Sequence, residues 1–164
     1  STGRKTAGLR AVSEYVLAYE HSVQANMTLE DFCRGLEDFV YRPQVYIETL
    51  KGAVILEEKT VGTRRVIHRK VEFETFSFED TVTLTPNAEM IERVAPFGQT
   101  AGSLYLVRGE KLSCDSIRVT FTYRESDTVR LPEKLARLRQ LAWAQKDRKL
   151  LDQIKDTFCR TAER

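Results

Sequence analysis

Charged and hydroxyl-bearing side chains interrupt alternating apolar segments of the chain, and these residues are the first candidates for chemistry. Arg69 and Asp80 each share the apolar phase of such a segment, and a turn near Thr75 would join the two segments as a hairpin. In that hairpin Val71 lies close to opposite Asp80, with Arg69 diagonally within reach. A buried guanidinium and carboxylate must pair or find other hydrogen bonds. The pair is therefore either a structural salt bridge or a polar anchor for a ligand carbonyl or enolate.

One histidine and four tyrosines form the second group of candidates. His21 falls on the more apolar face of an alternating segment, where it is either a hydrogen-bonded core residue or a general base. A tyrosine can place an apolar ring in a pocket and its hydroxyl on a substrate oxygen, although ordinary core packing explains each tyrosine equally well. The tyrosines are Tyr15, Tyr19, Tyr105 and Tyr123. The residues that we predict to be catalytic are Tyr19, His21, Arg69, Asp80 and Tyr123.

Familiar catalytic and cofactor motifs are missing from the sequence. It contains no GxGxxG, GxxxxGK[ST], GxSxG or HExxH. Its two histidines and three cysteines are far apart, which predicts no metal site and no cofactor. An odd number of cysteines without a CxxC motif predicts reduced thiols in a cytoplasmic protein.

Composition narrows the class of protein. A chain of 164 residues suits one domain, and 41% hydrophobic with 30% charged residues is typical of a globular fold. Lys and Arg number 26 against 24 Asp and Glu, which argues against a nucleic-acid binder. Aliphatic runs are only a few residues long and the start has no apolar core, so we predict neither membrane insertion nor a secretory signal. We expect a flexible arm over residues 1–12 and one ligand-binding domain over 13–164, as a monomer or a homodimer.

The spacing of apolar residues predicts the elements that must position these candidates. Residues 13–24 alternate and predict a strand. Thr28 followed by Asp31 resembles a capping box and predicts a helix that ends before Pro43, followed by a second short helix over 43–49. Further strands are predicted over 53–58, 63–73, 76–84, 89–95, 100–108 and 112–124. Their connections are short, which favours antiparallel neighbours.

The tail of the chain predicts one long helix from residue 132 to about 160, roughly 43 Å in length. Its apolar stripe begins with Leu131, Leu135, Leu138 and Ala142, which step by four, three and four. The charged run over 145–149 interrupts this stripe, and we predict it to be solvent surface, as we do the basic run over 64–70. One helix can cover a curved antiparallel sheet but cannot fill its concavity, so we expect a cavity that binds a ligand.

This order of elements resembles the helix-grip fold of the START and birch-pollen-allergen superfamily (SRPBCC), which includes polyketide cyclases. Within it, the chain is similar to the AtaL-like group in three stretches, YEHSVQAN with Leu29, FEDTVTLTP and RVTFTY, at 19–26, 78–86 and 118–123. The resemblance implies an α+β fold in which a curved seven-stranded antiparallel sheet wraps around a long C-terminal helix, with two short helices after the first strand. No invariant catalytic set runs through the superfamily, so none is carried over.

The resemblance also implies a function. We expect a cofactor-independent cyclase of polyketide biosynthesis, which binds a flexible apolar polyketide or polyene in a central cavity and promotes ring closure. The closure is either a pericyclic cycloaddition or a reaction in which a tyrosine, His21 or the Arg69–Asp80 pair moves a proton or polarises a carbonyl. A non-catalytic carrier or sensor of an apolar molecule is the alternative, and a protein-binding domain is the third. The predicted ligand-binding residues are Tyr15, Leu17, Leu56, Ile67, Val71, Phe78, Val82, Met90, Tyr105, Val119, Phe121 and Trp143.

Overall fold

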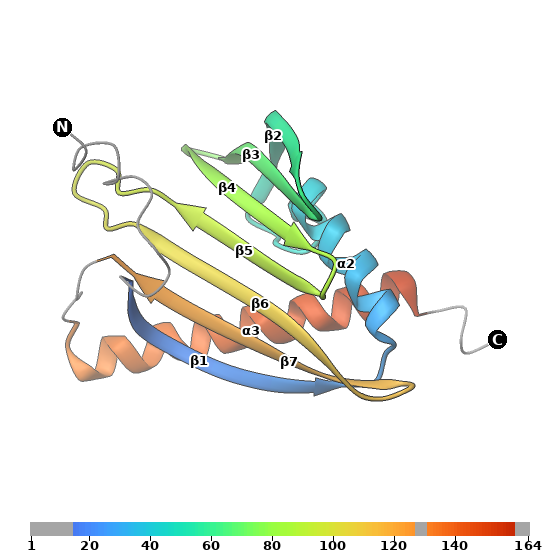
Figure 1. Cartoon of the computed structure of the whole chain (residues 1–164). Helices are drawn as coiled ribbons and strands as arrows, with labels where there is room; N and C mark the ends of the chain where they lie inside the picture. The colour runs from blue at the N-terminus through green and yellow to red at the C-terminus, as the bar shows by residue number, and fades with distance from the viewer. Residues whose placement is uncertain (1–14, 127–130, 160–164) are drawn as a thin grey trace.

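A single antiparallel sheet and two helices on one of its faces make up the part of the chain that the structure describes (Figure 1). The computed structural model describes residues 15–126 and 131–159, so the predicted arm over 1–12 lies outside the described residues. The elements in chain order are β1 (Val16–Ala25), α2 (Leu29–Tyr41), η2 (Pro43–Val45), β2 (Leu50–Val61), β3 (Arg64–Phe73), β4 (Ser77–Thr85), β5 (Glu89–Val94), β6 (Ser103–Ser113), β7 (Ser116–Glu125) and α3 (Glu133–Phe158). The seven strands are ordered β1-β7-β6-β5-β4-β3-β2. The predicted α+β helix-grip architecture is thereby confirmed.

The start and the end of α2 lie where the capping residue and the proline in the sequence predict them. The side chain of Thr28 accepts a hydrogen bond from the backbone N–H of Asp31 at 3.1 Å, which caps the helix. The helix ends at Tyr41, and its C-cap Arg42 is the residue before the proline. The second short helix is smaller than predicted, because only the 3-10 turn Pro43–Val45 forms before the chain enters β2.

The core lies between the sheet, α2 and the C-terminal half of α3. Phe32 and Leu36 of α2 meet Ile154 of α3 there, and all three are at most 2% exposed. Gly35 permits this close approach of the two helices, because a Cβ atom at that position would lie 2.4 Å from Cγ2 of Ile154. The anchored end of α3 is therefore its C-terminal half.

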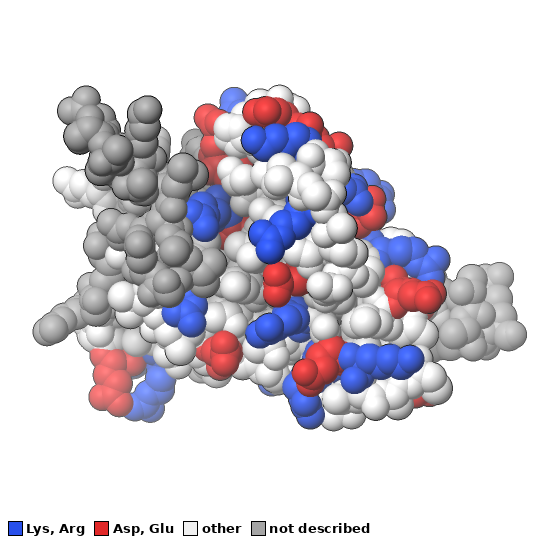
Figure 2. Space-filling view, in the orientation of Figure 1, with Lys and Arg blue, Asp and Glu red and all other residues white. Residues whose placement is uncertain are grey.

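The first half of α3 is not covered in the same way. Its leucines are exposed by 51% at Leu135, 54% at Leu138 and 67% at Leu141, and Leu131, just before the helix, is exposed by 37%. The predicted apolar stripe therefore packs on the core only in its later part. Charges of both signs are interspersed over the face seen in Figure 2, in keeping with the small net charge.

One strand boundary differs from the prediction. The sequence predicts a break at Gly109, yet β6 continues through this residue to Ser113. A Cβ atom at Gly109 would lie 2.6 Å from Cε2 of Phe32, so the glycine serves helix packing and not a turn. The connection to β7 falls instead at residues 114–115.

A bulge in β1 overturns the predicted orientation of two residues. The register shifts between Leu17 and Tyr19, so that Leu17 lies opposite Arg124 and Tyr19 lies opposite Tyr123. Leu17 is therefore on the outer face and half exposed. Tyr15 lies on the outer face too. The Arg93 guanidinium lies 5.8 Å from the centroid of its ring, and Arg93 is paired with Thr81, which alternates with the inward-facing residues of β4. The prediction that Tyr15 and Leu17 face the interior is wrong.

A second bulge affects the edge strand β2. The register shifts between Ile55 and Glu57, and the intervening Leu56 is 48% exposed. Ile55 lies opposite Arg69 and takes the inward position. The predicted ligand residue Leu56 is therefore half exposed and is not part of the packed core.

Candidate functional site

A buried carboxylate is the centre of the polar interior. Asp147 of α3 is 0% exposed. Its Oδ2 accepts a hydrogen bond from Nε2 of His21 at 2.6 Å, and its Oδ1 accepts one from the Tyr105 hydroxyl at 2.5 Å. The Tyr123 hydroxyl lies 2.8 Å from Oδ1 and 2.7 Å from Oδ2. Three donors from three strands therefore satisfy one buried charge.

Strand register explains why these donors converge. Tyr105 of β6 lies directly opposite Tyr123 of β7, so both rings project from the inner face at the same level. His21 of β1 lies opposite Phe121, two residues from Tyr123 along β7. Burial, reinforced by the Asp147 carboxylate, raises the pKa of both tyrosines above its ordinary value. Both hydroxyls therefore remain protonated and act as donors at neutral pH.

Stacked aromatic rings form one wall of the site. Trp143 stacks on Tyr123 with ring centroids 4.2 Å apart and an interplanar angle of 11°. Tyr19 stacks on Trp143 at 6.2 Å and on His21 at 5.2 Å. The Arg139 guanidinium covers the Trp143 ring at 4.4 Å from its centroid. The stack fixes the plane of the His21 ring beside its carboxylate.

A lysine and a glutamate occupy the neighbouring part of the site. Nζ of Lys146 lies 4.3 Å from the ring centroid of Tyr105 and 5.2 Å from that of Tyr123. Burial lowers the pKa of Lys146. On β5, burial and then the nearby Asp80 carboxylate raise the pKa of Glu92 to about 8. A proton donor or acceptor of this kind is matched to work near neutral pH.

The predicted Arg69–Asp80 pair is real and buried. Nε and Nη2 of Arg69 donate to Oδ1 and Oδ2 of Asp80 at 3.0 and 2.6 Å, and Nη2 also lies 3.2 Å from Oε2 of Glu92. The register places Arg69 directly opposite Asp80, and Val71 opposite Phe78. The predicted diagonal arrangement is therefore wrong, because the chain turns tightly at residues 74–75, where the Phe73 N–H donates to the Phe76 carbonyl at 2.8 Å, and this sets the register. One guanidinium thus contacts two acidic side chains, which links the Arg69–Asp80 pair to Glu92.

Two cavities border Lys146. The first, called the site cavity here, has a volume of about 220 Å³. Its lining includes Glu92, Tyr105, Tyr123, Arg139, Trp143 and Lys146. The second, called the helix groove, has a volume of about 470 Å³ and lies between α3 and the segment around η2. Lys146 lines both, with Tyr46 and Gln145 among the other residues of the helix groove.

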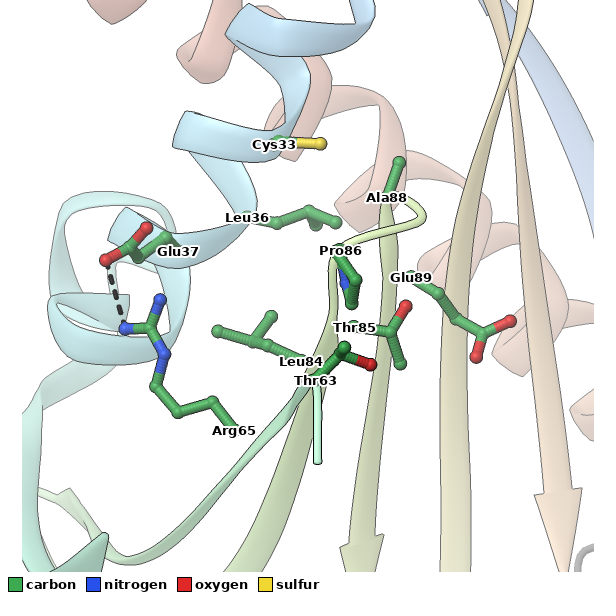
Figure 3. Close-up of a pocket in the computed structure, with 10 residues that line it drawn as sticks. All are labelled: Cys33, Leu36, Glu37, Thr63, Arg65, Leu84, Thr85, Pro86, Ala88 and Glu89. Carbon is green, nitrogen blue, oxygen red and sulfur yellow. Dashed lines mark hydrogen bonds and ion pairs between the residues drawn. The ribbon is translucent and has the colours of Figure 1, made fainter. Parts of the chain in front are cut away.

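A third cavity, of about 230 Å³, lies between α2 and the turns that join β2 to β3 and β4 to β5 (Figure 3). The figure shows Arg65 directed at Glu37, and its Nη1 lies 3.1 Å from Oε1 of that residue. Its other lining side chains are mainly apolar or hydroxyl groups, such as Leu36, Thr63 and Pro86. Its one cation is thus already paired, and this cavity is poorly equipped for acid–base chemistry.

The structure brings together most of the predicted catalytic candidates. His21 and Tyr123 contact Asp147, and Tyr19 stacks on His21. The Arg69–Asp80 pair reaches the same region only through Glu92. Whether these groups catalyse a reaction stays a prediction.

The predicted ligand residues divide into three groups. Tyr105 and Trp143 line the site cavity. Five belong to the packed core under α2 and α3, namely Ile67, Val82, Met90, Val119 and Phe121. Val71 is 3% exposed, and Phe78 stacks on Phe73 at 5.9 Å. The expected open concavity is thus largely filled by side chains at the α2 end, and space remains beside Lys146.

Sequence reasoning missed three residues of the site. The prediction that Lys146 and Asp147 are solvent surface is wrong, because Asp147 is fully buried and Lys146 is packed against tyrosine rings. A signal was available: Trp143, Asp147 and Leu150 follow at steps of four and three, so they share one helical face. Glu92 alternates in phase with Met90, but the neighbouring Ile91 phase was equally apolar.

Neither metal-ligating clusters nor membrane-spanning helices were found in the described part of the chain. Within residues 15–126 and 131–159, no group of three or more His, Cys, Asp or Glu side chains is placed to hold a metal ion. No helix within those ranges has the length and apolar character needed to span a bilayer.

Comparison with known proteins identifies the class of fold. The sequence matches no family model and no curated protein. Solved structures do match: an aromatase/cyclase, Zhui, from Streptomyces sp. R1128 superposes with a TM-score of 0.60 at 15% identity, covering 88% of this chain and 94% of that one. A START superfamily protein from Mycobacterium smegmatis gives 0.62 at 11% identity, over 85% and 97% of the two chains.

A third similar structure is the di-domain aromatase/cyclase StfQ of the steffimycin biosynthetic pathway, with a TM-score of 0.64 at 8% identity. It covers 93% of this chain, which spans 53% of that longer protein. The chain therefore has the helix-grip fold of the START superfamily, a fold that polyketide aromatase/cyclases share. At these identities the likeness establishes the fold, and function must be argued from the site.

Proposed function

We propose that this chain is a cofactor-independent cyclase that binds a flexible, keto-rich polyketide chain and promotes its ring closure by proton transfer. The observation that carries the proposal is the buried Asp147 carboxylate, held by His21, Tyr105 and Tyr123, of which the two tyrosines line the site cavity. The fold shared with aromatase/cyclases supports it.

The Asp147–His21 contact suits a general base. The carboxylate accepts the Nε2 proton of the imidazole at 2.6 Å, which fixes the tautomer and leaves the other ring nitrogen free of that proton. It also stabilises the imidazolium that forms when His21 takes up a proton. A methylene between two carbonyls is acidic enough to be the proton source, and its loss yields an enolate.

Ring closure then requires an acid as well as a base. The enolate carbon attacks a second carbonyl of the same chain, and the alkoxide that forms must be protonated. Glu92 suits this role, because a carboxyl group with a pKa of about 8 is largely protonated at neutral pH. Holding the two reacting carbons of a flexible chain in contact contributes a further large share of the rate, because the entropy is lost on binding.

The polarity of the site favours this chemistry over a pericyclic cycloaddition of a polyene. A pericyclic step needs neither a base nor an acid, whereas the lining of the site cavity includes Glu92 and Lys146. Burying such groups costs free energy unless they are used or paired. The substrate that fits them carries carbonyl or hydroxyl oxygens.

Turnover of a defined substrate tests the proposal. The purified protein is incubated with a synthetic tetraketide thioester, and products are followed by liquid chromatography and mass spectrometry against a protein-free control. We expect a cyclised product of equal mass, or one lighter by a water molecule. Asp147→Asn is expected to lower the rate by roughly 10²–10⁴-fold, as for loss of a general acid or base. Leu138→Ala, on the exposed stripe, is the matched control and retains the wild-type rate.

Recovery of the thioester unchanged in a bound form would instead support the carrier or sensor function. Equal rates with and without protein, together with no binding, would overturn both. Equilibrium dialysis of the same tetraketide thioester measures binding, and so distinguishes binding without turnover from the absence of both.

A further inference from the structure

Lys146 is a partly buried lysine that the proton-transfer scheme above does not use. We infer that Lys146 is a nucleophile that forms an imine with a ketone carbonyl of the bound chain. This inference rests on the proposed function, which it deepens by assigning covalent catalysis to the same site.

The immediate contacts of Lys146 are unusual for a lysine. Among the residues that the structure describes, it makes no ion pair with a carboxylate within 4.0 Å. Its Nζ faces two tyrosine rings instead, at 4.3 Å from the centroid of Tyr105 and 5.2 Å from that of Tyr123. An amine held between aromatic faces is desolvated without being neutralised by a partner, which keeps its lone pair available once the proton is lost.

Charged and titratable groups from every neighbouring element act on this amine. Tyr105 of β6 and Tyr123 of β7 face it and remain neutral, while Glu92 of β5 and Asp147 of α3 are the nearby acids. Burial outweighs the two acids and lowers the pKa of Lys146. An ordinary lysine is neutral in fewer than about one molecule in a thousand at pH 7, so any lowering enlarges the reactive fraction.

Access and proton supply complete the argument. Lys146 lines both the site cavity and the helix groove, so its side chain borders two volumes from which a carbonyl compound can approach. Glu92 lines the same site cavity and is largely protonated at neutral pH. A general acid therefore stands beside the nucleophile, as imine formation requires.

The step balances without any cofactor. The Nζ lone pair attacks the carbonyl carbon, and after proton transfer from nitrogen to oxygen a carbinolamine forms. Its hydroxyl group takes a proton from Glu92 and leaves as water, which gives the iminium. Loss of a proton from the adjacent carbon to Glu92 then gives an enamine, whose carbon attacks the second carbonyl of the chain. Glu92 protonates the alkoxide that this attack forms, which leaves an iminium on Lys146. One water molecule hydrolyses the iminium, which releases the cyclised product, restores the amine and returns a proton to Glu92.

Reductive trapping of the wild-type protein tests this inference directly. The full chain is incubated at pH 7 with ethyl acetoacetate and sodium cyanoborohydride, which reduces an iminium to a stable secondary amine, and labelled lysines are identified by peptide mass mapping. We expect Lys146 to be labelled several-fold faster than any other lysine. Its labelling should also reach half its maximum at a lower pH than that of Lys134, an exposed lysine on the same helix.

Matched variants sharpen the result. Lys146→Arg keeps the charge but cannot form the imine, so the fast label should disappear, whereas Lys134→Arg should leave it unchanged. Glu92→Gln should slow labelling of Lys146 without removing it. Equal labelling of Lys146 and Lys134 in the wild type would overturn the inference, and that comparison needs no variant to fold.

The two proposals fail in different ways. Labelling of Lys146 without cyclisation of the tetraketide thioester would support the nucleophilic role of Lys146 and would contradict the proposed cyclase function. If Lys146→Arg cyclises the substrate at the wild-type rate and the wild type shows no fast label, the cyclase function is supported and the nucleophilic role of Lys146 is contradicted.

Discussion

The two halves of α3 differ in how they pack on the rest of the molecule, although they form one continuous helix. In the C-terminal half, Leu150, Leu151 and Ile154 are at most 3% exposed and pack against α2 and the sheet. In the N-terminal half, Leu138 and Leu141 are 54% and 67% exposed. Asp147 lies at the junction, where apolar packing gives way to the polar site.

The difference between the two halves of α3 shows which part of the helix holds the polar site in place. Burying a carboxylate, an amine and two hydroxyl groups contributes little net stability, even when every hydrogen bond is made. The apolar half must therefore hold the helix in place, and the site depends on that anchor. The predictions below test the division, beginning at the anchored end.

The largest effect is expected at Ile154. Ile154→Ala removes a fully buried side chain that fills the space left by Gly35, and we expect it to destabilise the fold by about 2–5 kcal/mol. Leu138→Ala is the matched change in the exposed half and should cost less than about 0.5 kcal/mol. Urea unfolding measures both. Equal losses would show that the two halves of α3 are anchored alike and would refute the comparison.

The sequence predicted the anchored half better than the site. The capping residue predicted the start of α2. The alternation of apolar residues predicted the seven strands, because burial repeats at the period of a strand. His21 and Tyr123 were identified for the same reason, as polar positions on apolar faces. Pairwise register was harder: Arg69 and Asp80 were placed diagonally, since the turn between their strands leaves no unambiguous residue count.

Asp147 escaped prediction because its neighbours in the chain are charged. The helical face that it shares with Trp143 and Leu150 indicates burial, but its burial also needs the donors on β1, β6 and β7, which this local pattern does not identify. The β1 bulge that turned Tyr15 and Leu17 outward is likewise a feature of strand pairing. Exposure of the first leucines of α3 could not be foreseen either, because a helical stripe does not say how far the sheet extends beneath it.

The next effect concerns the junction itself. Asp147→Asn keeps the shape but replaces one acceptor oxygen by an N–H donor that faces groups which already donate, so we expect a loss of about 1–3 kcal/mol. Tyr105→Phe removes a single donor and should cost less. Urea unfolding at pH 7 compares the two variants. A larger loss for Tyr105→Phe would mean that the carboxylate is not the centre of the network.

A pH-dependent effect is expected at Glu92. Its pKa in the folded protein is about 8 because of burial and the Asp80 carboxylate, so the folded state holds a proton that the unfolded state releases above about pH 4.5. Stability therefore falls as pH rises from about 5 to 8. Glu92→Gln cannot ionise and should remove this fall, which we expect to amount to about 1–2 kcal/mol because the side chain is 24% exposed.

Urea unfolding of the wild type and of Glu92→Gln at pH 5, 6, 7 and 8 provides the measurement. The difference between the two proteins isolates Glu92 from other titrating groups. A difference that stays constant over this range would show that Glu92 ionises normally, and would remove its proposed role as an acid.

The smallest effect is expected at the rim of the site. Arg139 covers the Trp143 ring at 4.4 Å and pairs with Glu125 at 2.8 Å, and Arg139→Met keeps the apolar stem but loses both contacts. A partly exposed cation–π contact of this kind contributes about 0.5–1 kcal/mol. Arg137→Met removes only an exposed pair with Glu133 on the same helix and should change stability by less than about 0.5 kcal/mol.

Fluorescence distinguishes a local from a global consequence of losing Arg139. Trp143 is the only tryptophan of the chain, so its emission reports the rim alone. We expect a changed emission maximum for Arg139→Met and an unchanged one for Arg137→Met, at nearly equal stability. If both spectra match the wild type, the guanidinium does not cover the indole in solution, and the exposed half of α3 contributes less to the shape of the site than its contacts imply.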